Sequence, residues 1–150
     1  MQDEIISFLG GRAAEELVLK VVTTGASNDI ERATALVRSM VMKYGMSDKF
    51  GPVQYGDEGD EVFIGRDIGH TRNYSENTAD QIDAEVKEIL NFSYSEAKRL
   101  IKENINVLHA SAKLLMEKEK ITGDEFRELF KLNKPAVQNE TAAEDETDAE

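Results

Sequence analysis

The sequence predicts a mainly α-helical bundle with one small β-hairpin and a disordered acidic C-terminal tail. Apolar residues recur every three or four positions through most of residues 2–133, which is the period of amphipathic helices. Two short β-prone stretches flank the acidic turn GDEGDE, a pattern typical of a hairpin. Residues 134–150 hold six acidic side chains, one lysine and no aromatic residue, so burial cannot offset their ordering entropy.

The composition argues against several classes of function. The chain has 150 residues, no cysteine and two histidines, which rules out disulfides and thiol nucleophiles and disfavours a self-contained histidine-rich metal site. Acidic residues outnumber basic ones by 30 to 18, and we expect no nucleic-acid partner because such binding draws on clustered cations. No apolar run approaches the roughly 18 residues of a bilayer span, and the N-terminus lacks signal-peptide character. We therefore expect this segment to be soluble.

The first predicted helix covers residues 2–20. Its apolar stripe has helical spacing and consists of Ile6, Leu9, Ala13 and Leu17. Gly10 and Gly11 interrupt it, and each costs about 1 kcal/mol relative to alanine inside a helix. We expect another backbone to approach this glycine pair closely, because close approach is the main benefit of a missing side chain.

A second helix is predicted over residues 28–44. Ser27 or Asn28 is expected to cap its start, with Glu31 reaching back to Asn28, and Gly45 is a residue type that commonly ends a helix. The apolar stripe of this helix consists of Ile30, Ala33, Val37, Met40, Val41 and Tyr44.

The hairpin and a long helix follow. The hairpin strands are predicted at 53–55 and 61–64, on either side of the acidic turn. The longest helix is predicted to begin at Ser75, and apolar residues keep helical spacing until a break near Asn104 or Asn106. A further helix is expected after that break.

The last helix opens with a capping box. Thr122 and Glu125 have the spacing in which each side chain satisfies a backbone amide of the other residue. Pro135 follows the last apolar position and marks a boundary near residue 133. The chain is thus divided into a folded region, 1–133, and a tail, 134–150.

The sequence contains no complete catalytic constellation. Compact zinc hydrolase sites use His-Glu-x-x-His on one helix, and neither histidine of this chain begins such a motif. His70 follows the predicted hairpin in a glycine-flanked loop, and His109 is expected to be a packed helical side chain. Glu15 and Glu16 are adjacent and diverge by about 100° around a helix, so they cannot act on one substrate. We expect Glu16 to pair with Arg12 or Lys20, each one turn away on its own helix.

Asp29 stands in the first turn of the second predicted helix and leans toward its apolar side. One interpretation is a carboxylate favoured by the positive end of the helix dipole, worth roughly 0.3–1 kcal/mol. The other is a metal ligand on a rigid helix end. Helix physics alone favours the first interpretation.

A resemblance to a known family changes that balance. The relevant strings run in order through most of the chain, from about residue 3 to 131, and are LGGRAAEE (9–16), TTGASNDIERAT (23–34), MVMKYGMSDKFGPVQY (40–55), EVFIGRD (61–67), INVLH (105–109) and LLMEKEKITGDEF (114–126). They closely resemble the C-terminal part of the peptidase domain of FtsH-type proteases, which are membrane-anchored, ATP-dependent AAA+ zinc metallopeptidases.

The resemblance implies a role for Asp29. In this family zinc lies between the two histidines of His-Glu-x-x-His and an Asp in a Ser-Asn-Asp segment, and that Asp corresponds to Asp29. It implies that residues 1–133 are the C-terminal portion of the peptidase domain. The two histidines, the catalytic Glu, the ATPase module that uses ATP and Mg, and the membrane anchor are expected upstream. This chain therefore holds no catalytic residue, and we expect it to be inactive alone.

The resemblance also implies partners and a location. The family forms homohexamers at the cytoplasmic side of the bacterial inner membrane and degrades unfolded and membrane proteins for quality control. Contact with the membrane is expected only through the upstream anchor. The alternative interpretation is a non-catalytic helical module for oligomerisation or interaction, in which Asp29 is only a cap.

Overall fold

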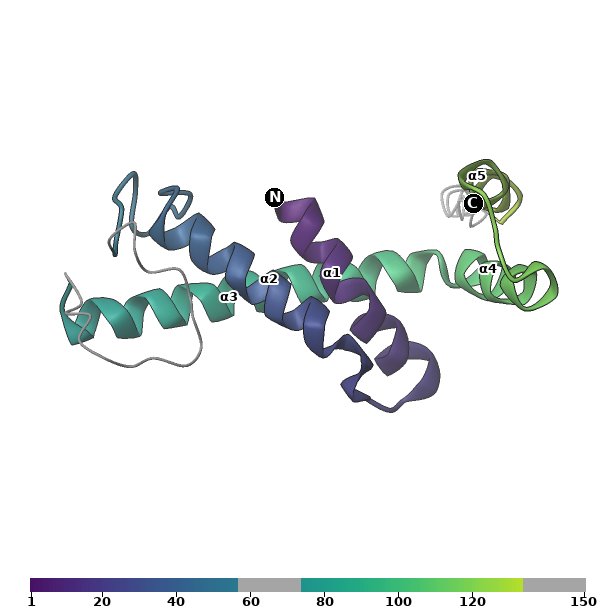
Figure 1. Cartoon of the computed structure of the whole chain (residues 1–150), viewed down its shortest axis with the longest axis horizontal. Coiled ribbons are helices and arrows are strands. Elements are labelled where there is room, and N and C mark those ends of the chain that lie inside the picture. The colour runs from purple at the N-terminus through teal and green to yellow at the C-terminus, as the bar shows by residue number, and fades with distance from the viewer. Residues whose placement is uncertain (57–73, 134–150) are drawn as a thin grey trace, which may run out of the picture. The chain divides into compact units, whose positions relative to one another are not determined.

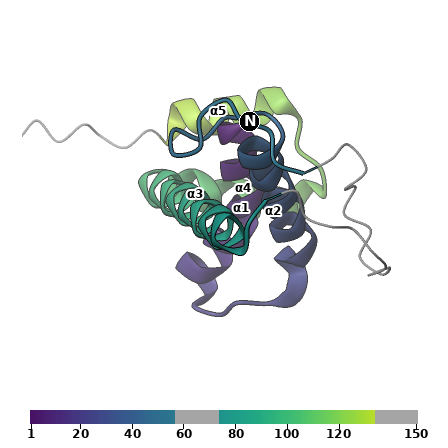
Figure 2. The same ribbon diagram turned by 90° about the vertical axis from the view of Figure 1, so that its left-hand side faces the viewer.

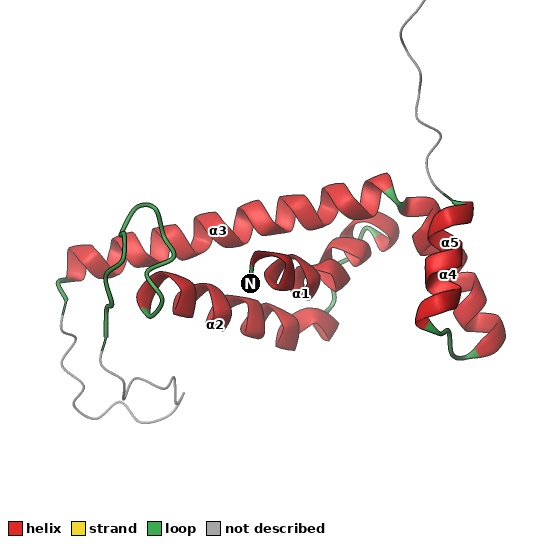
Figure 3. Cartoon of the chain, turned by 90° about the horizontal axis from the view of Figure 1, so that it is seen from above, coloured by secondary structure: helices red, strands yellow, loops and turns green. Residues whose placement is uncertain are grey.

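The computed structural model describes residues 1–56 and 74–133, and the chain divides into two compact units. The first unit, Met1–Lys102, contains the helices α1 (Gln2–Ala14), α2 (Ser27–Met42) and nearly all of α3 (Glu76–Glu103). The second begins at Glu103 and contains α4 (Ile105–Lys118) and α5 (Gly123–Leu132). In the part of the chain that the structure describes, all regular elements are helical (Figure 3), which confirms the mainly α-helical prediction.

The core of the first unit is made by one face of each helix. Buried positions recur every fourth residue along α1 and α2, and α3 adds a matching face. The buried apolar core residues are Ile5, Leu9, Ala13, Ala33, Val37, Val41, Ile82, Val86 and Ala97. Helices α1 and α2 lie beside α3 (Figures 1 and 2). The apolar residues that recur every three or four positions in the sequence therefore predict these helices correctly.

Helix α1 does not continue regularly to residue 20. A π-helical turn, Glu15–Leu19, replaces its last turn, and Lys20 then adopts the left-handed conformation with φ of 56°. The close approach predicted at Gly10 and Gly11 is not made by the described residues, because a Cβ at either position would meet no atom within 4 Å. Both glycines lie outside the face that α1 buries.

An irregular but hydrogen-bonded segment follows α2. Gly45 has φ of +59°, and a Cβ placed on it would lie 2.8 Å from Cα of Pro52. The backbone N–H of Tyr55 donates to the carbonyl of Met42 at 2.8 Å, which returns the chain to the end of α2. Residues 53–55 form no strand here, and the second predicted strand, 61–64, lies outside the described residues.

The second unit is a pair of helices with little buried surface. Only Val107 and Ser111 of its described residues are buried, both on α4. The predicted break occurs at Asn104, which holds the N-cap position of α4 without a side-chain cap hydrogen bond. The predicted capping box at α5 is confirmed, since Glu125 N–H donates to Thr122 Oγ1 at 3.3 Å and Thr122 N–H donates to Glu125 Oε2 at 2.8 Å.

No helix within the described ranges has both the length and the apolar character needed to cross a bilayer. The predicted tail, 134–150, lies outside these ranges.

Candidate metal-ligand site

Asp29 lies in the first turn of α2 and its side chain is half-buried. The helix begins at Ser27 and its N-cap is Ala26, without a side-chain cap hydrogen bond, so the predicted capping by Ser27 or Asn28 is wrong. Within residues 1–56 and 74–133 the Asp29 carboxylate has neither a hydrogen bond nor an ion pair. Its oxygens are therefore available to bind a metal ion, and they lie on a helix that its buried side chains hold in place.

The loop before α2 is fixed by Glu15 of the π-helical turn. The Thr23 hydroxyl donates to Oε1 of Glu15 at 2.8 Å, and the Thr23 N–H donates to Oε2 at 3.2 Å. The same hydroxyl accepts the N–H of Gly25 at 3.1 Å. One carboxylate and one hydroxyl thus satisfy two backbone amides that precede the helix bearing Asp29. We call Glu15, Thr23 and Gly25 the loop clamp.

The adjacent carboxylate has a different function. Glu16 accepts a short hydrogen bond from the Tyr94 hydroxyl and a bond of 3.4 Å from Nζ of Lys98, both on α3. The hydrogen bond from Tyr94 is the main cause that lowers the pKa of Glu16, while burial and the same bond raise the pKa of Tyr94. The hydrogen-bond partners of Glu16 come from α3 and were not predicted, while the charge of Arg12, one turn earlier on α1, also lowers the pKa of Glu16. Glu16 therefore joins the end of α1 to α3.

The histidines do not extend the site in the described part of the chain. His109 is exposed on α4, so the prediction of a packed side chain is wrong, and His70 lies outside the described residues. No group of three His, Cys, Asp or Glu side chains suited to a metal ion occurs among the described residues. The carboxylate of Asp29 is a donor that zinc accepts, so the site fits a zinc ion as one ligand of several.

Sequence reasoning identified Asp29 but missed Thr23. The partner of Thr23 is eight positions earlier and is reached through a π-helical turn and a left-handed residue, which local spacing rules do not anticipate. A weak signal was present, because threonine two residues before glycine is common in turns where the hydroxyl bonds a following amide.

Known proteins that are similar in sequence to this chain are zinc metalloproteases. The chain is 55% identical over 130 residues to the ATP-dependent zinc metalloprotease FtsH 1 of Thermoanaerobacter sp. (strain X514), covering 87% of this chain and 21% of the relative. It is 55% identical over 129 residues to the ATP-dependent zinc metalloprotease FtsH of Caldicellulosiruptor bescii, covering 86% of this chain and 21% of the relative. For Thermotoga maritima the identity is 49% over 128 residues, with 85% and 21% covered.

The family is defined by a second finding. The model of Peptidase family M41 matches residues 1–129, and the chain belongs to this family. The resemblance predicted from the sequence strings is thereby confirmed. The chain spans about a fifth of the length of these curated relatives.

Proposed function

We propose that this chain is the C-terminal part of the peptidase domain of an ATP-dependent zinc metalloprotease, and that Asp29 is the third protein ligand of its zinc. Membership in Peptidase family M41 and the similarity to ATP-dependent zinc metalloproteases support the protease class. The single observation that supports Asp29 is its geometry: a half-buried carboxylate in the first turn of α2 without a partner among the described residues. Family membership favours this interpretation over a non-catalytic interaction module.

In this proposal, the other components of the zinc site come from parts of the protease beyond the residues described here. Two histidines and the general-base Glu of His-Glu-x-x-His, together with the ATPase module and the membrane anchor, belong in the rest of the protease. Zinc in such a site supplies Lewis-acid activation of water and of the peptide carbonyl. This chain contributes a fixed carboxylate and a helical scaffold, and it neither holds stoichiometric zinc nor cleaves peptides alone. The assembled protease is a homohexamer that acts on protein substrates at the inner membrane.

The test uses the longer protein in which we place this chain, called here the complete protease. We expect Asp29→Ala to lose zinc and proteolysis while ATP hydrolysis continues, because only one metal donor is removed. Glu31→Ala is the matched control, since Glu31 is an exposed carboxylate on the same helix. Metal content by atomic absorption, casein hydrolysis and phosphate release measure the three properties. Unchanged zinc content in Asp29→Ala would remove the ligand assignment.

A second measurement uses the 150-residue chain. We expect no stoichiometric zinc after purification with zinc present, and no hydrolysis of casein. Stoichiometric zinc together with chelator-sensitive hydrolysis would overturn the proposal that the chain is inactive alone.

A further inference from the structure

We propose that Glu15 is a positioning residue that sets the orientation of the first turn of α2, and hence of Asp29, through the loop clamp. The inference rests on the proposed ligand role of Asp29. It concerns a residue that touches neither metal nor substrate in the proposal and acts only through Thr23 and Gly25.

The first step of the argument is that the clamp fixes the loop at its backbone. Both oxygens of the Glu15 carboxylate are engaged, one by the hydroxyl and one by the N–H of Thr23. A bidentate contact restricts rotation as well as distance, so Thr23 is oriented and not merely tethered. Hydrogen bonds to a charged carboxylate are also stronger than neutral ones.

The second step is that the clamp transmits directly into α2. Thr23 caps the 3₁₀ turn Thr24–Ala26 by accepting the Gly25 N–H, and that turn leads without a break into Ser27, the first residue of α2. Ala26 is 5% exposed and packs as a second anchor of the turn. Because Asp29 lies only a few residues beyond this anchored turn, a shift of Thr23 displaces the start of its helix.

The third step concerns space around the clamp. A Cβ placed on Gly25 would lie 3.2 Å from Thr23 Oγ1 and 3.6 Å from Glu15 Oε1. The backbone of the turn therefore approaches both polar partners closely. The π-helical turn Glu15–Leu19 contributes to this arrangement, because it begins with two adjacent carboxylates that face different partners. Glu15 contacts the loop before α2, and Glu16 contacts α3. π-helical turns occur frequently at functional sites.

The experiment compares two adjacent carboxylates that undergo the same chemical change. Glu15→Gln leaves one acceptor oxygen where two are needed, and Glu16→Gln removes the same charge from the contact with α3. In the 150-residue chain, we expect Glu15→Gln to accelerate amide exchange at Thr23 by about 10-fold. In the complete protease, we expect zinc affinity, measured by chelator competition, to fall by roughly 10-fold or more, as for other groups that orient metal ligands. Glu16→Gln should leave both quantities unchanged.

Substitutions at Thr23 provide a second route if Glu15→Gln fails to fold. Thr23→Val removes the hydroxyl that accepts from Gly25 and donates to Glu15, but keeps the backbone N–H that donates to Glu15. We expect Thr23→Val to accelerate amide exchange at Gly25 and to lower zinc affinity. Thr23→Ser keeps the hydroxyl, so its exchange rate and zinc affinity should equal those of the unsubstituted protein. A general loss of stability would also accelerate exchange at the core amides of α1 and α2, whereas loss of the clamp should accelerate it only at the loop.

Failure of this inference is distinguishable from failure of the proposed function. If Asp29→Ala loses zinc but Glu15→Gln and Thr23→Val bind it normally, the positioning role is wrong and the ligand role stands. If Glu16→Gln weakens zinc binding as much as Glu15→Gln, the effect is general and the positioning role is also wrong. If Asp29→Ala keeps its zinc, the proposed function itself is wrong.

Discussion

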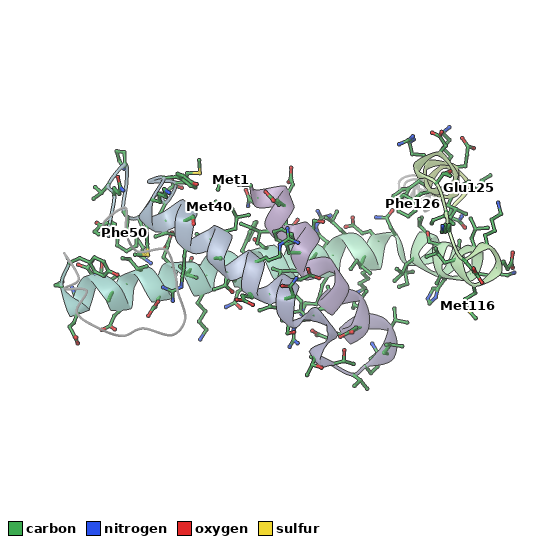
Figure 4. The ribbon with its side chains drawn as sticks, in the orientation of Figure 1. Met1, Met40, Phe50, Met116, Glu125 and Phe126 are labelled. Atoms are coloured by element: carbon green, nitrogen blue, oxygen red, sulfur yellow. The ribbon has the colours of Figure 1, made fainter. Side chains whose placement is uncertain are left out.

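The two units of the chain are both helical but are stabilised in different ways. In the first unit, three helices each bury one face in a shared apolar core that includes Ile5, Val37 and Val41 at 0% exposure. In the described part of the second unit, α4 buries two residues and α5 none, and Met116 is 87% exposed (Figure 4). Packing therefore stabilises the first unit, whereas caps and ion pairs contribute a larger share in the second.

The comparison bears on the proposed ligand role of Asp29, which lies in the first unit. A ligand must be held within a fraction of an ångström, and helices with packed cores supply that precision better than isolated helix pairs. Asp29 is on α2, whose buried positions Ala33, Val37 and Val41 fix the helix against its neighbours. The loop clamp fixes the segment that directly precedes this helix.

The largest expected effect comes from a cavity in the core of the first unit. Ile82 is 2% exposed, and Ile82→Ala should lower the free energy of unfolding by about 3 kcal/mol, because buried methyl groups are lost and a cavity remains. Met116→Ala in the second unit is the control and should change it by less than about 0.5 kcal/mol. Urea denaturation monitored by circular dichroism measures both. Equal effects would contradict the contrast between the units.

The next largest effect on stability comes from replacing glycine by alanine at two contrasting positions. Gly45→Ala should cost about 2 kcal/mol, because φ is +59° and the new Cβ would lie 2.8 Å from Pro52 Cα. Gly11→Ala in α1 meets open space and should instead stabilise the 150-residue chain by about 0.5–1 kcal/mol. Thermal unfolding of both variants checks the two signs.

The same Gly11→Ala variant sharpens the functional proposal. If another helix of the complete protease packs against Gly10 and Gly11, the substitution should destabilise that protein while it stabilises the isolated chain. Stabilisation of both would show that the glycine pair serves no close helix contact.

The smallest expected effect is a pH dependence confined to α5. The Lys118 amine, followed by the amide and hydroxyl of Thr122, lowers the pKa of Glu125 from 4.5 to about 2. A lowered pKa means that the stabilisation is fully present above pH 4.5 and is lost as the pH falls toward 2. The protection factors of amides at the start of α5, which correct for the intrinsic pH dependence of exchange, should fall over this range, and Glu125→Gln should remove that fall. Lys118 and Glu125 are both at the surface, so high salt should reduce the effect.

The sequence predicts the parts of this structure that depend on local rules. The helix of α2, its end near Gly45 and the capping box of Thr122 and Glu125 each follow from residues within a few positions of one another. Contacts between distant segments have no such signature. Glu16 is 78 positions from Tyr94, and no spacing rule on one helix selects that partner.

The site shows the same division. Asp29 was identified through strings that resemble a known family, and its position in the first turn of α2 agrees with the helix pattern. The clamp was not identified, because the π-helical turn at Glu15 changes the direction in which side chains project. The predicted caps Ser27 and Asn28 failed for a related reason: the 3₁₀ turn already supplies Ala26 as the residue before the helix.

One measurement tests the ligand role of Asp29 most directly. The 150-residue sequence contains no cysteine, so Asp29→Cys in the complete protease introduces a thiolate where the carboxylate ligand is proposed. With cobalt replacing zinc, thiolate coordination adds a sulfur-to-cobalt charge-transfer absorption. We predict that this absorption appears in Asp29→Cys and is absent from both Glu31→Cys and the unsubstituted protein. Cobalt bound without that absorption in Asp29→Cys would contradict the assignment of Asp29 as a metal ligand.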